Sequence, residues 1–416
     1  MLTSTVVAND HVHLSSPSHS DAISARKEVP CFSSKRMLES IDVTSKYTSV
    51  DDFLNKNKLH QRRELGRGDF GKVHAVDGEK TKNLCVMKTA ISHQKGLDFS
   101  ELNPLQIHDK NVAETYMGLV KDKETGELEV ITSLDSIEGK TKTSKLMLVL
   151  SEYASGTDLS KYLDDFADRD EFIPYDLART IAAKVGQAIS AVNKNFVYLD
   201  LKSDNVRVNV DKKTGEVTVK LIDFGSSCPE SQVDKLSAQT SKEGTPLGTQ
   251  GYIAHEAWNH KYSKKADSWS FGALLTDLII MKTPDQIYGE SSDADEKGLS
   301  DETLGGIDYL KKIALFADWS DEQKAEEILA YFDEDVAGDY RELVDAIVAL
   351  TKSNPDDRIS TEEACNRLQK IAGFHGKEVH DEIASDKDSS EQVAPTKSKE
   401  VEAVSNDPYS EGALSE

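Results

Sequence analysis

Residues 197–205 read VYLDLKSDN. This stretch places Asp200, Lys202 and Asn205 within six residues, between an apolar approach and a second apolar run. Taken alone, such a cluster is typical of a surface turn, because Asp and Asn side chains hydrogen-bond to nearby backbone. The rest of the chain decides whether the stretch is a turn or a site.

The composition limits the class of protein. The chain has 416 residues, of which 38% are hydrophobic and 30% charged, with a formal net charge of −24. So negative a protein is not expected to bind nucleic acid or an anionic membrane, because both attract basic surfaces. The four cysteines are scattered without a CxxC pair, which favours a reducing compartment and a cytoplasmic protein.

The two ends differ from the middle of the chain. Residues 1–50 are rich in Ser and Thr and show no sustained periodicity, so we expect residues 1–56 to be mostly disordered. Residues 376–416 carry eleven acids against four lysines and are expected to form an acidic disordered tail. The longest apolar stretch, 271–281, is too short and too polar for membrane insertion.

The middle of the chain changes character near residue 153. Before it we expect strands at 73–78, 83–90, 128–136 and 145–153, with one helix around 106–120. After it the apolar spacing becomes helical, as in 177–192, apart from a hairpin whose strands are joined across DKKTGE. A strand-rich front and a helix-rich back predict an α+β body of two lobes.

A glycine array precedes the first clear strand. Gly66, Gly68 and Gly71 form GxGxxGxV, in which successive N–H groups could cradle a phosphate. The residues that follow alternate as a hairpin, whereas a dinucleotide-binding array would open a helix. This context favours a glycine loop over a nucleotide, with a plain glycine-rich turn as the alternative.

Two charged residues follow apolar strands. Lys88 ends CVMK, where a half-buried ammonium needs a partner unless it reaches water at an edge. Asp223 follows an apolar strand in LIDFGSS and could be directed at a metal ion, or could simply mark a strand-end turn.

Seven motifs in order resemble those of a eukaryotic-type Ser/Thr protein kinase over residues 57–375. The resemblance implies an N-lobe at 57–152 and a C-lobe at 153–375. The motifs are GRGDFG, Lys88, YLDLKSDN, DFG at 223–225, GTQGYIAHE at 248–256, DSWSFG at 267–272 and NPDDR at 354–358.

The resemblance implies ATP and Mg²⁺ as cofactors. The glycine loop would cover the phosphates, and Val73 would pack on adenine. Lys88 would hold the α- and β-phosphates and pair with a helix glutamate. We expect that glutamate to be Glu114 rather than Glu101, because Pro104 should break a helix that carries Glu101.

The other catalytic roles follow from the same resemblance. Asp223 would ligate Mg²⁺, and Asn205 would ligate a second Mg²⁺. Asp200 would accept the proton of the attacking hydroxyl, and Lys202 would stabilise the transferring phosphoryl group. Thr249, within the activation segment 223–256, points with Lys202 to Ser or Thr as the acceptor.

Further positions concern the nucleotide, the protein substrate and the C-lobe. The backbone at Glu152 and Ala154 would meet adenine. Asp158 would reach the ribose and a basic residue before the phosphosite, which implies protein substrates with Arg or Lys at that place. Glu256 and Arg358 match the family's buried ion pair, and Asp267 resembles the acid that holds the catalytic loop.

The chain also departs from the family pattern. Leu199 replaces an arginine that usually receives an activation-loop phosphate, so we expect no need for that phosphate. His255 replaces a proline. Such departures suggest a bacterial or viral effector delivered into a host cell cytosol. A pseudokinase acting as a binding scaffold and a small-molecule phosphotransferase remain alternatives.

Overall fold

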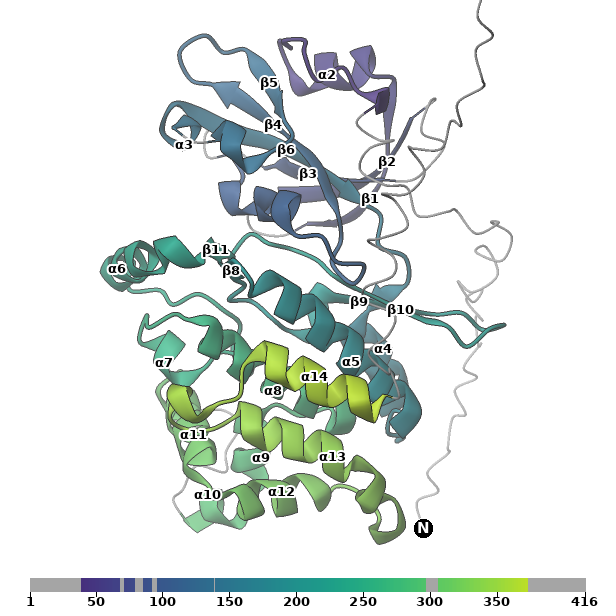
Figure 1. Ribbon diagram of the computed structural model, residues 1–416, viewed down its shortest axis with the longest axis vertical. Coiled ribbons are helices and arrows are strands. Elements are labelled where there is room, and N and C mark those ends of the chain that lie inside the picture. Colours follow the sequence, from purple (N-terminus) through teal and green to yellow (C-terminus); the bar gives the residue numbers. More distant parts are fainter. Residues whose placement is uncertain are drawn as a thin grey trace, which may run out of the picture. The chain divides into compact units, whose positions relative to one another are not determined.

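The strand-rich front is an antiparallel sheet that carries Lys88. The computed structural model describes residues 39–67, 71–78, 85–91, 96–137, 139–296 and 306–372. Within these residues, six strands form one sheet in the order β1-β2-β3-β6-β4-β5 (Figure 1). Their bounds are β1 Leu59–Arg67, β2 Gly71–Gly78, β3 Cys85–Ala90, β4 Thr115–Asp122, β5 Leu128–Ile131 and β6 Ser144–Glu152.

The central strands are apolar because both of their faces are covered. β6 (KLMLVLSE after Ser144) is almost entirely buried and pairs with β3 on one side and β4 on the other. The register places Val73 of β2 opposite Lys88 of β3, and Lys88 opposite Val149 of β6. Lys88 therefore lies in the middle of the sheet, where an ammonium must find carboxylates.

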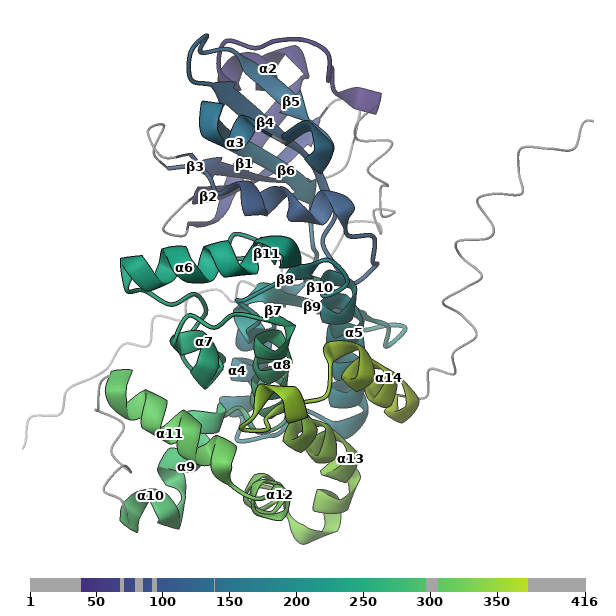
Figure 2. The same ribbon diagram turned by 60° about the vertical axis from the view of Figure 1, so that its left-hand side comes forward.

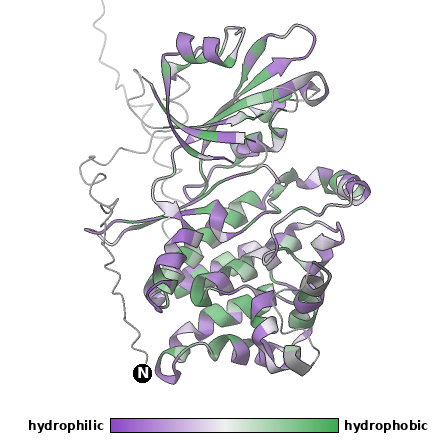
Figure 3. Ribbon diagram, turned by 180° about the vertical axis from the view of Figure 1, so that it is seen from behind, coloured by the Kyte–Doolittle hydropathy of each residue, from purple (hydrophilic) through white to green (hydrophobic). Residues whose placement is uncertain are grey.

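The back of the chain is helical, as the spacing predicts. Its centre is α8 (Lys264–Ile280), in which nearly every side chain is buried, and α5 (Tyr175–Val192) packs beside it. Figure 3 colours the inner helices of this part mainly hydrophobic. The other helices are α4 Leu159–Ala167, α6 Val233–Glu243, α7 His255–Trp258, α9 Pro284–Glu290, α10 Ser292–Glu296, α11 Gly306–Asp318, α12 Asp321–Leu329, α13 Glu334–Leu350 and α14 Thr361–Ile371.

Short strands frame the stretch 197–205. β8 (Phe196–Val197) pairs with β11 (Cys228–Pro229), and Figure 2 shows α6 beside this pair. The expected hairpin is present as β9 (Val206–Val210) and β10 (Val217–Leu221), with β7 (Thr157–Asp158) on its edge. The stretch is thus fixed at both ends by strand pairing.

Serine side chains cap the starts of two helices in the helical part. Ser320 is the N-cap of α12 and accepts from Gln323 N, and Ser360 accepts from Glu363 N at the start of α14. Among the described residues, no helix is long and apolar enough to cross a bilayer.

The helix expected around 106–120 is wrong. The helical element is instead a short 3₁₀ helix, η1 (Phe99–Gln106), and β4 occupies Thr115–Asp122. The segment TYMGLV pairs with β6, which lets its buried side chains fill the sheet. Tertiary pairing therefore overrides the helical spacing of these residues. Two further short elements, η2 (Leu134–Ile137) and α3 (Lys140–Thr143), connect β5 to β6.

The ordered front also begins earlier than residue 57. Helix α2 (Val50–Lys56) starts at the N-cap Ser49, whose side chain accepts from Asp52 N. Phe53 is fully buried and lies edge-to-face against Tyr47, with ring centroids 5.1 Å apart. Because Tyr47 also bridges to Leu128 of β5, residues from Ile41 onward belong to the core of the sheet.

This packing predicts that α2 stabilises the front of the protein. Replacing Phe53 by Ala should lower the free energy of unfolding by about 3–5 kcal/mol, because a buried aromatic ring is lost. Val43→Ala is the matched control, since Val43 is 40% exposed, and should change it by less than about 0.5 kcal/mol. Urea unfolding would measure both values. Equal effects for the two variants would show that α2 is not part of the core.

Candidate active site

Lys88 lies between two carboxylates from distant segments. Its Nζ donates to Glu101 Oε1 at 2.5 Å and to Asp223 Oδ1 at 3.0 Å. Glu101 comes from η1 and Asp223 follows β10. One ammonium thus joins three elements that are far apart in sequence.

The pairing of Lys88 corrects our expectation of Glu114. Glu114 precedes β4, and its backbone N–H donates to Glu152 Oε2 at 3.1 Å. Pro104 does not disrupt Glu101, because η1 is a short 3₁₀ helix whose last bond runs from Ile107 N to the Pro104 carbonyl. A proline is costly chiefly where its missing N–H and its ring would interrupt a continuing α-helix.

The electrostatics of this cluster follow from its burial. Burial raises the pKa of Glu101 to about 7, although the charge of Lys88 pulls it down. Burial alone would lower the pKa of Lys88, but the charges of Glu101 and Asp223 outweigh it, and the pKa rises. Lys88 therefore keeps its charge, and Glu101, the more buried acid, is the one that takes up a proton most easily.

The stretch 197–205 forms a hydrogen-bonded group with one threonine. The Thr249 hydroxyl donates to Asp200 Oδ1 at 2.6 Å and accepts from Lys202 Nζ at 2.8 Å. Lys202 Nζ lies 3.3 Å from Asp200 Oδ2. Asn205 Nδ2 donates to the Asp200 carbonyl at 2.8 Å and to Asp200 Oδ2 at 3.0 Å. The reading of this stretch as an ordinary surface turn is therefore wrong.

The buried carboxylate of Asp267 holds the backbone next to this group. Asp267 has no solvent exposure and accepts from Tyr198 N at 2.7 Å and Leu199 N at 2.8 Å. Asn193 Nδ2 also donates to it, at 2.7 Å. Burial raises the pKa of Asp267 to about 6, while these bonds oppose the rise. Leu199 has φ of 68°, a costly left-handed backbone that these contacts hold in place.

Asp223 is placed next to the same group. Its neighbour Ile222 donates N–H to the Asn205 carbonyl at 2.9 Å, and Ile222 O accepts from the Tyr198 hydroxyl at 2.5 Å. The Tyr198 and Phe224 rings meet edge-to-face with centroids 5.1 Å apart. Asp223 and Asn205 are thus brought together by backbone and ring contacts.

These two residues fit a hard divalent cation. Asn205 uses its amide nitrogen on Asp200, so its amide oxygen is not consumed by those bonds. The carboxylate of Asp223 remains about half exposed at 47%. Carboxylate and amide oxygens are ligands that Mg²⁺ accepts, usually together with waters and phosphates.

Part of the glycine array can be described. Gly66 lies in β1 and Gly71 opens β2, whereas Gly68 lies outside the described residues. A Cβ at Gly71 would be 3.0 Å from Leu97 Cδ2 and from the Thr89 carbonyl, so this position leaves little room for a larger residue. The strands that follow the array, β2 and β3, are paired antiparallel, which matches the hairpin context predicted from sequence.

The carboxylate of Asp158, which we expect to reach the ribose and a basic substrate residue, is already paired with two cations of the protein. Ala154 is buried, and Glu152 Oε2 accepts from Lys220 Nζ at 2.8 Å. The Asp158 carboxylate is bound by Arg207 Nη1 at 2.5 Å and Lys161 Nζ at 2.6 Å. Burial would raise the pKa of Asp158, but these two cations lower it.

A family model described as the protein kinase domain matches residues 59–368, about three quarters of the chain. The chain belongs to the protein kinase family.

Several relatives agree with this assignment. The kinase is similar to cAMP-dependent protein kinase type 3 of Saccharomyces cerevisiae, with 26% identity over 61% of this chain and 54% of the relative. It is also similar to human dual specificity tyrosine-phosphorylation-regulated kinase 3, with 26% identity over 58% of this chain and 36% of the relative. Rat serine/threonine-protein kinase MRCK beta is 24% identical over 62% of this chain and 14% of the relative. The kinase spans about half of the first relative's length and less of the others.

The C-lobe ion pair expected from the sequence is present. Arg358 donates to Glu256 through Nη1 at 2.5 Å and through Nη2 at 2.9 Å. The Arg358 guanidinium also lies over the Trp269 ring, 5.1 Å from its centroid. His255 is half-buried with Nδ1 3.4 Å from Glu256 Oε2, and burial lowers its pKa. The substitution of proline by His255 therefore keeps the pair intact.

Sequence reasoning missed the cations that neutralise acids around the cleft. Arg207 of β9 lies opposite its partner Asp158 in β7 of the same sheet, whereas Lys220 of β10 meets Glu152 at the end of β6 in the six-stranded sheet. The alternation in VRVNV and VTVKL shows that these side chains leave the core face. Nothing in the alternation indicates which acids they meet.

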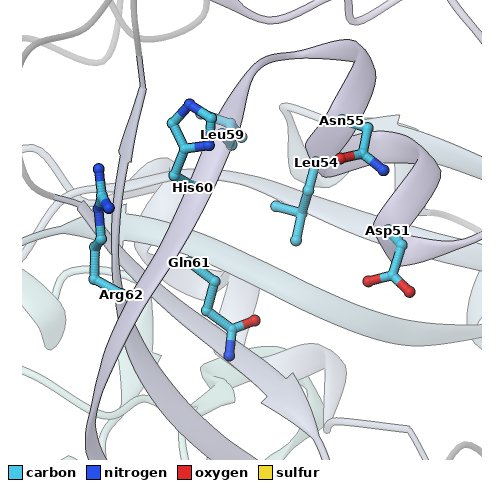
Figure 4. Close-up of a pocket in the computed structure, with 7 residues that line it drawn as sticks. All are labelled: Asp51, Leu54, Asn55, Leu59, His60, Gln61 and Arg62. Atoms are coloured by element: carbon cyan, nitrogen blue, oxygen red, sulfur yellow. The ribbon is translucent and has the colours of Figure 1, made fainter.

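A separate surface pocket lies away from the predicted site residues. It is lined by seven residues of α2 and β1 (Figure 4): Asp51, Leu54, Asn55, Leu59, His60, Gln61 and Arg62. None of these residues is among those that surround Lys88 or Asp200.

The raised pKa of Glu101 predicts a pH-dependent activity. As the pH falls through about 7, Glu101 gains a proton and Lys88 loses one of its two counter-charges. The kcat/KM for ATP, which reports the free enzyme, should fall over this range. Glu101→Gln should be less active and should lack this acid limb. A wild-type profile without an inflection between about pH 6 and 8 would contradict the assignment.

Ionisation of Glu101 should change the free energy of unfolding in the opposite direction to the activity as the pH rises. The pKa of Glu101 in the folded state lies above its ordinary value of 4.5. Ionising this buried acid therefore reduces the free energy of unfolding as the pH rises through the range between the two values. Activity and stability are thus expected to diverge across neutral pH.

Proposed function

We propose that this protein is an ATP- and Mg²⁺-dependent Ser/Thr protein kinase that transfers the γ-phosphate to protein hydroxyl groups. The observation that carries the proposal is the convergence of Lys88, Asp223, Asn205, Lys202 and Asp200, through a chain of short contacts. Phosphoryl transfer depends on positioning and charge stabilisation, and these residues supply both.

Asn205 and Asp223 would hold Mg²⁺, which when bound neutralises charge on the phosphate oxygens. Lys88 lies close enough to Asp223 to reach the same phosphates from the sheet side. Lys202 lies next to Asp200 and would face the transferring phosphoryl group. The residues therefore surround the nucleotide phosphates with two cationic side chains and two metal ligands.

Asp200 is suited to orient the acceptor. Its Oδ1 accepts from the Thr249 hydroxyl, and its Oδ2 accepts from Asn205. Both bonds fix the carboxylate plane, and the hydroxyl of Thr249 models how an aliphatic alcohol approaches Asp200. The acceptor hydroxyl would give its proton to Asp200 as its oxygen bonds to phosphorus and the bond to the leaving ADP oxygen breaks.

The contact of Thr249 with Asp200 and Lys202 favours Ser or Thr as the acceptor. One of the similar proteins is named a dual specificity kinase, so tyrosine phosphorylation is the alternative outcome in an acceptor assay. The departures at Leu199 and His255 also motivate the hypothesis of an effector acting in the cytosol of a eukaryotic host, which stays a prediction.

Removing any one of Lys88, Asp200 or Asp223 should abolish most of the transfer. Each Ala variant loses a charge aimed at nucleotide, metal or hydroxyl, and such a loss typically costs about 10²–10³ in rate. Asp176→Ala is the control, since its side chain is 82% exposed, and it should keep the wild-type rate. Transfer from labelled ATP to a generic protein would be measured.

The same assay separates the competing functions. A pseudokinase scaffold would bind nucleotide without transfer, and a small-molecule phosphotransferase would leave protein substrates unlabelled. Near-normal transfer by Asp223→Ala would show that the metal assignment is wrong.

The substrate preference is a further prediction. Acidic residues continue beyond Asp158 at the end of α4 and after it, and a cleft lined by one sign of charge attracts the opposite sign. We therefore expect a preference for Ser or Thr preceded by Arg or Lys, although a substrate cation must compete with Arg207 and Lys161 for Asp158. The further acids are Asp164, Asp165, Asp168, Asp170 and Glu171.

A peptide array would measure this preference in wild type and in Asp158→Ala. The basic preference should weaken in the variant and at high salt. Selection for acidic flanks, or an unchanged basic preference in Asp158→Ala, would rule out the assignment of Asp158.

A further inference from the structure

The glutamate that pairs with Lys88 lies on a 3₁₀ helix of about two turns. η1 has eight residues, and its N-cap Asp98 accepts from Ser100 N at 2.9 Å. Isolated helical turns of this length are not stable by themselves in water. The position of Glu101 must therefore be set by contacts that η1 makes with its surroundings.

One side of η1 packs closely against the sheet. Leu102 is fully buried, and a Cβ at Gly118 of β4 would lie 2.8 Å from Leu102 Cδ2. The absence of a side chain at Gly118 is what allows this close approach. η1 therefore cannot move towards β4.

The other side of η1 is hydrogen-bonded to the start of the activation segment. Ser100 Oγ donates to the Gly225 carbonyl at 2.8 Å. Asn103 Nδ2 donates to Ser227 Oγ at 2.8 Å and to the Ser227 carbonyl at 3.3 Å. Asn103 and Ser227 are both buried, so water cannot replace these bonds.

Ser227 is in turn hydrogen-bonded to Phe224. Its hydroxyl donates to the Phe224 carbonyl at 2.7 Å, and its N–H donates to the same oxygen at 2.9 Å. A Cβ at Gly225 would lie 2.9 Å from Glu101 Oε1 and 3.3 Å from Asp223 Oδ1. Glu101 and the 223–225 turn are thus in direct contact, with Asn103 and Ser227 beside them.

We propose that Asn103 and Ser227 are positioning residues that lock Glu101 and the 223–225 turn into one unit. We call the four residues Ser100, Asn103, Gly225 and Ser227 the η1 latch. The latch holds the Lys88–Glu101 pair and Asp223 in register for nucleotide without help from a longer helix. The inference rests on the proposed kinase function for its kinetic test and on exchange of backbone amides for an independent one.

The kinetic test is a double-mutant cycle between Asn103→Ala and Glu101→Gln. If Asn103 acts through Glu101, its removal should lower kcat/KM for ATP about tenfold in the wild-type background and less than about twofold in Glu101→Gln. It should also displace the acid limb of the pH profile, which a general loss of stability would not move. An equal tenfold loss in both backgrounds would overturn the proposal.

The matched control is Asn111→Ala. Asn111 is also buried, and its Nδ2 donates to Gln187 Oε1 of α5 at 2.9 Å instead of to a latch residue. This variant should lower the melting temperature to a similar extent and leave the cycle and the pH profile unchanged. The same kinetic pattern in Asn111→Ala would show that the effect of Asn103 is only structural.

Hydrogen exchange tests the latch without any nucleotide. Peptides covering 223–228 should exchange faster in Asn103→Ala and Ser227→Ala than in wild type or Asn111→Ala, all folded as judged by circular dichroism. Unchanged exchange in both latch variants would overturn the proposal. Wild-type protein that transfers no phosphate but shows this exchange pattern would refute the kinase function and leave the latch standing.

Discussion

One half-buried ammonium constrains how the candidate site of this protein is built. Lys88 lies in the centre of a six-stranded sheet, where its charge could not stay unpaired without a cost of several kcal/mol. It is compensated by Glu101 from η1 and by Asp223 from the end of β10. Satisfying this single charge therefore brings the sheet, a connecting segment and the activation segment to the same point.

The chemistry of the site depends on a second buried charge that never meets substrate. Asp267 holds the backbone of Tyr198 and Leu199, and so fixes the direction in which Asp200 leaves the chain. The residues that would act on phosphate or hydroxyl are therefore partly exposed, while those that position them are buried. The activation segment shows the same division between partly exposed and buried residues. There the buried Arg358–Glu256 pair anchors α7, which follows Thr249 in sequence.

The departures from the family pattern fall on positioning residues. Leu199 is buried and offers no cation to a phosphate, so order in the activation segment must come from elsewhere. The hydrogen bonds of Asn103 to Ser227 and of Ser100 to Gly225 supply such order from η1.

Local motifs in the sequence were sufficient to predict the two-lobed α+β fold and the residues of the proposed phosphate-handling site. Asp200, Lys202 and Asn205 are neighbours in sequence, so short-range geometry already brings them together. The partner of Lys88 was beyond this reasoning. Glu114 stands in the segment with helical spacing, and only the pairing of β4 with β6, directly after Glu114, excludes a helix there. The pairing of Asp158 with Arg207 and the core position of Phe53 likewise depend on which distant segments meet. Sequence determined what each residue could do locally, and tertiary structure decided which charges share a buried space, because that choice is set by the packing of the whole sheet.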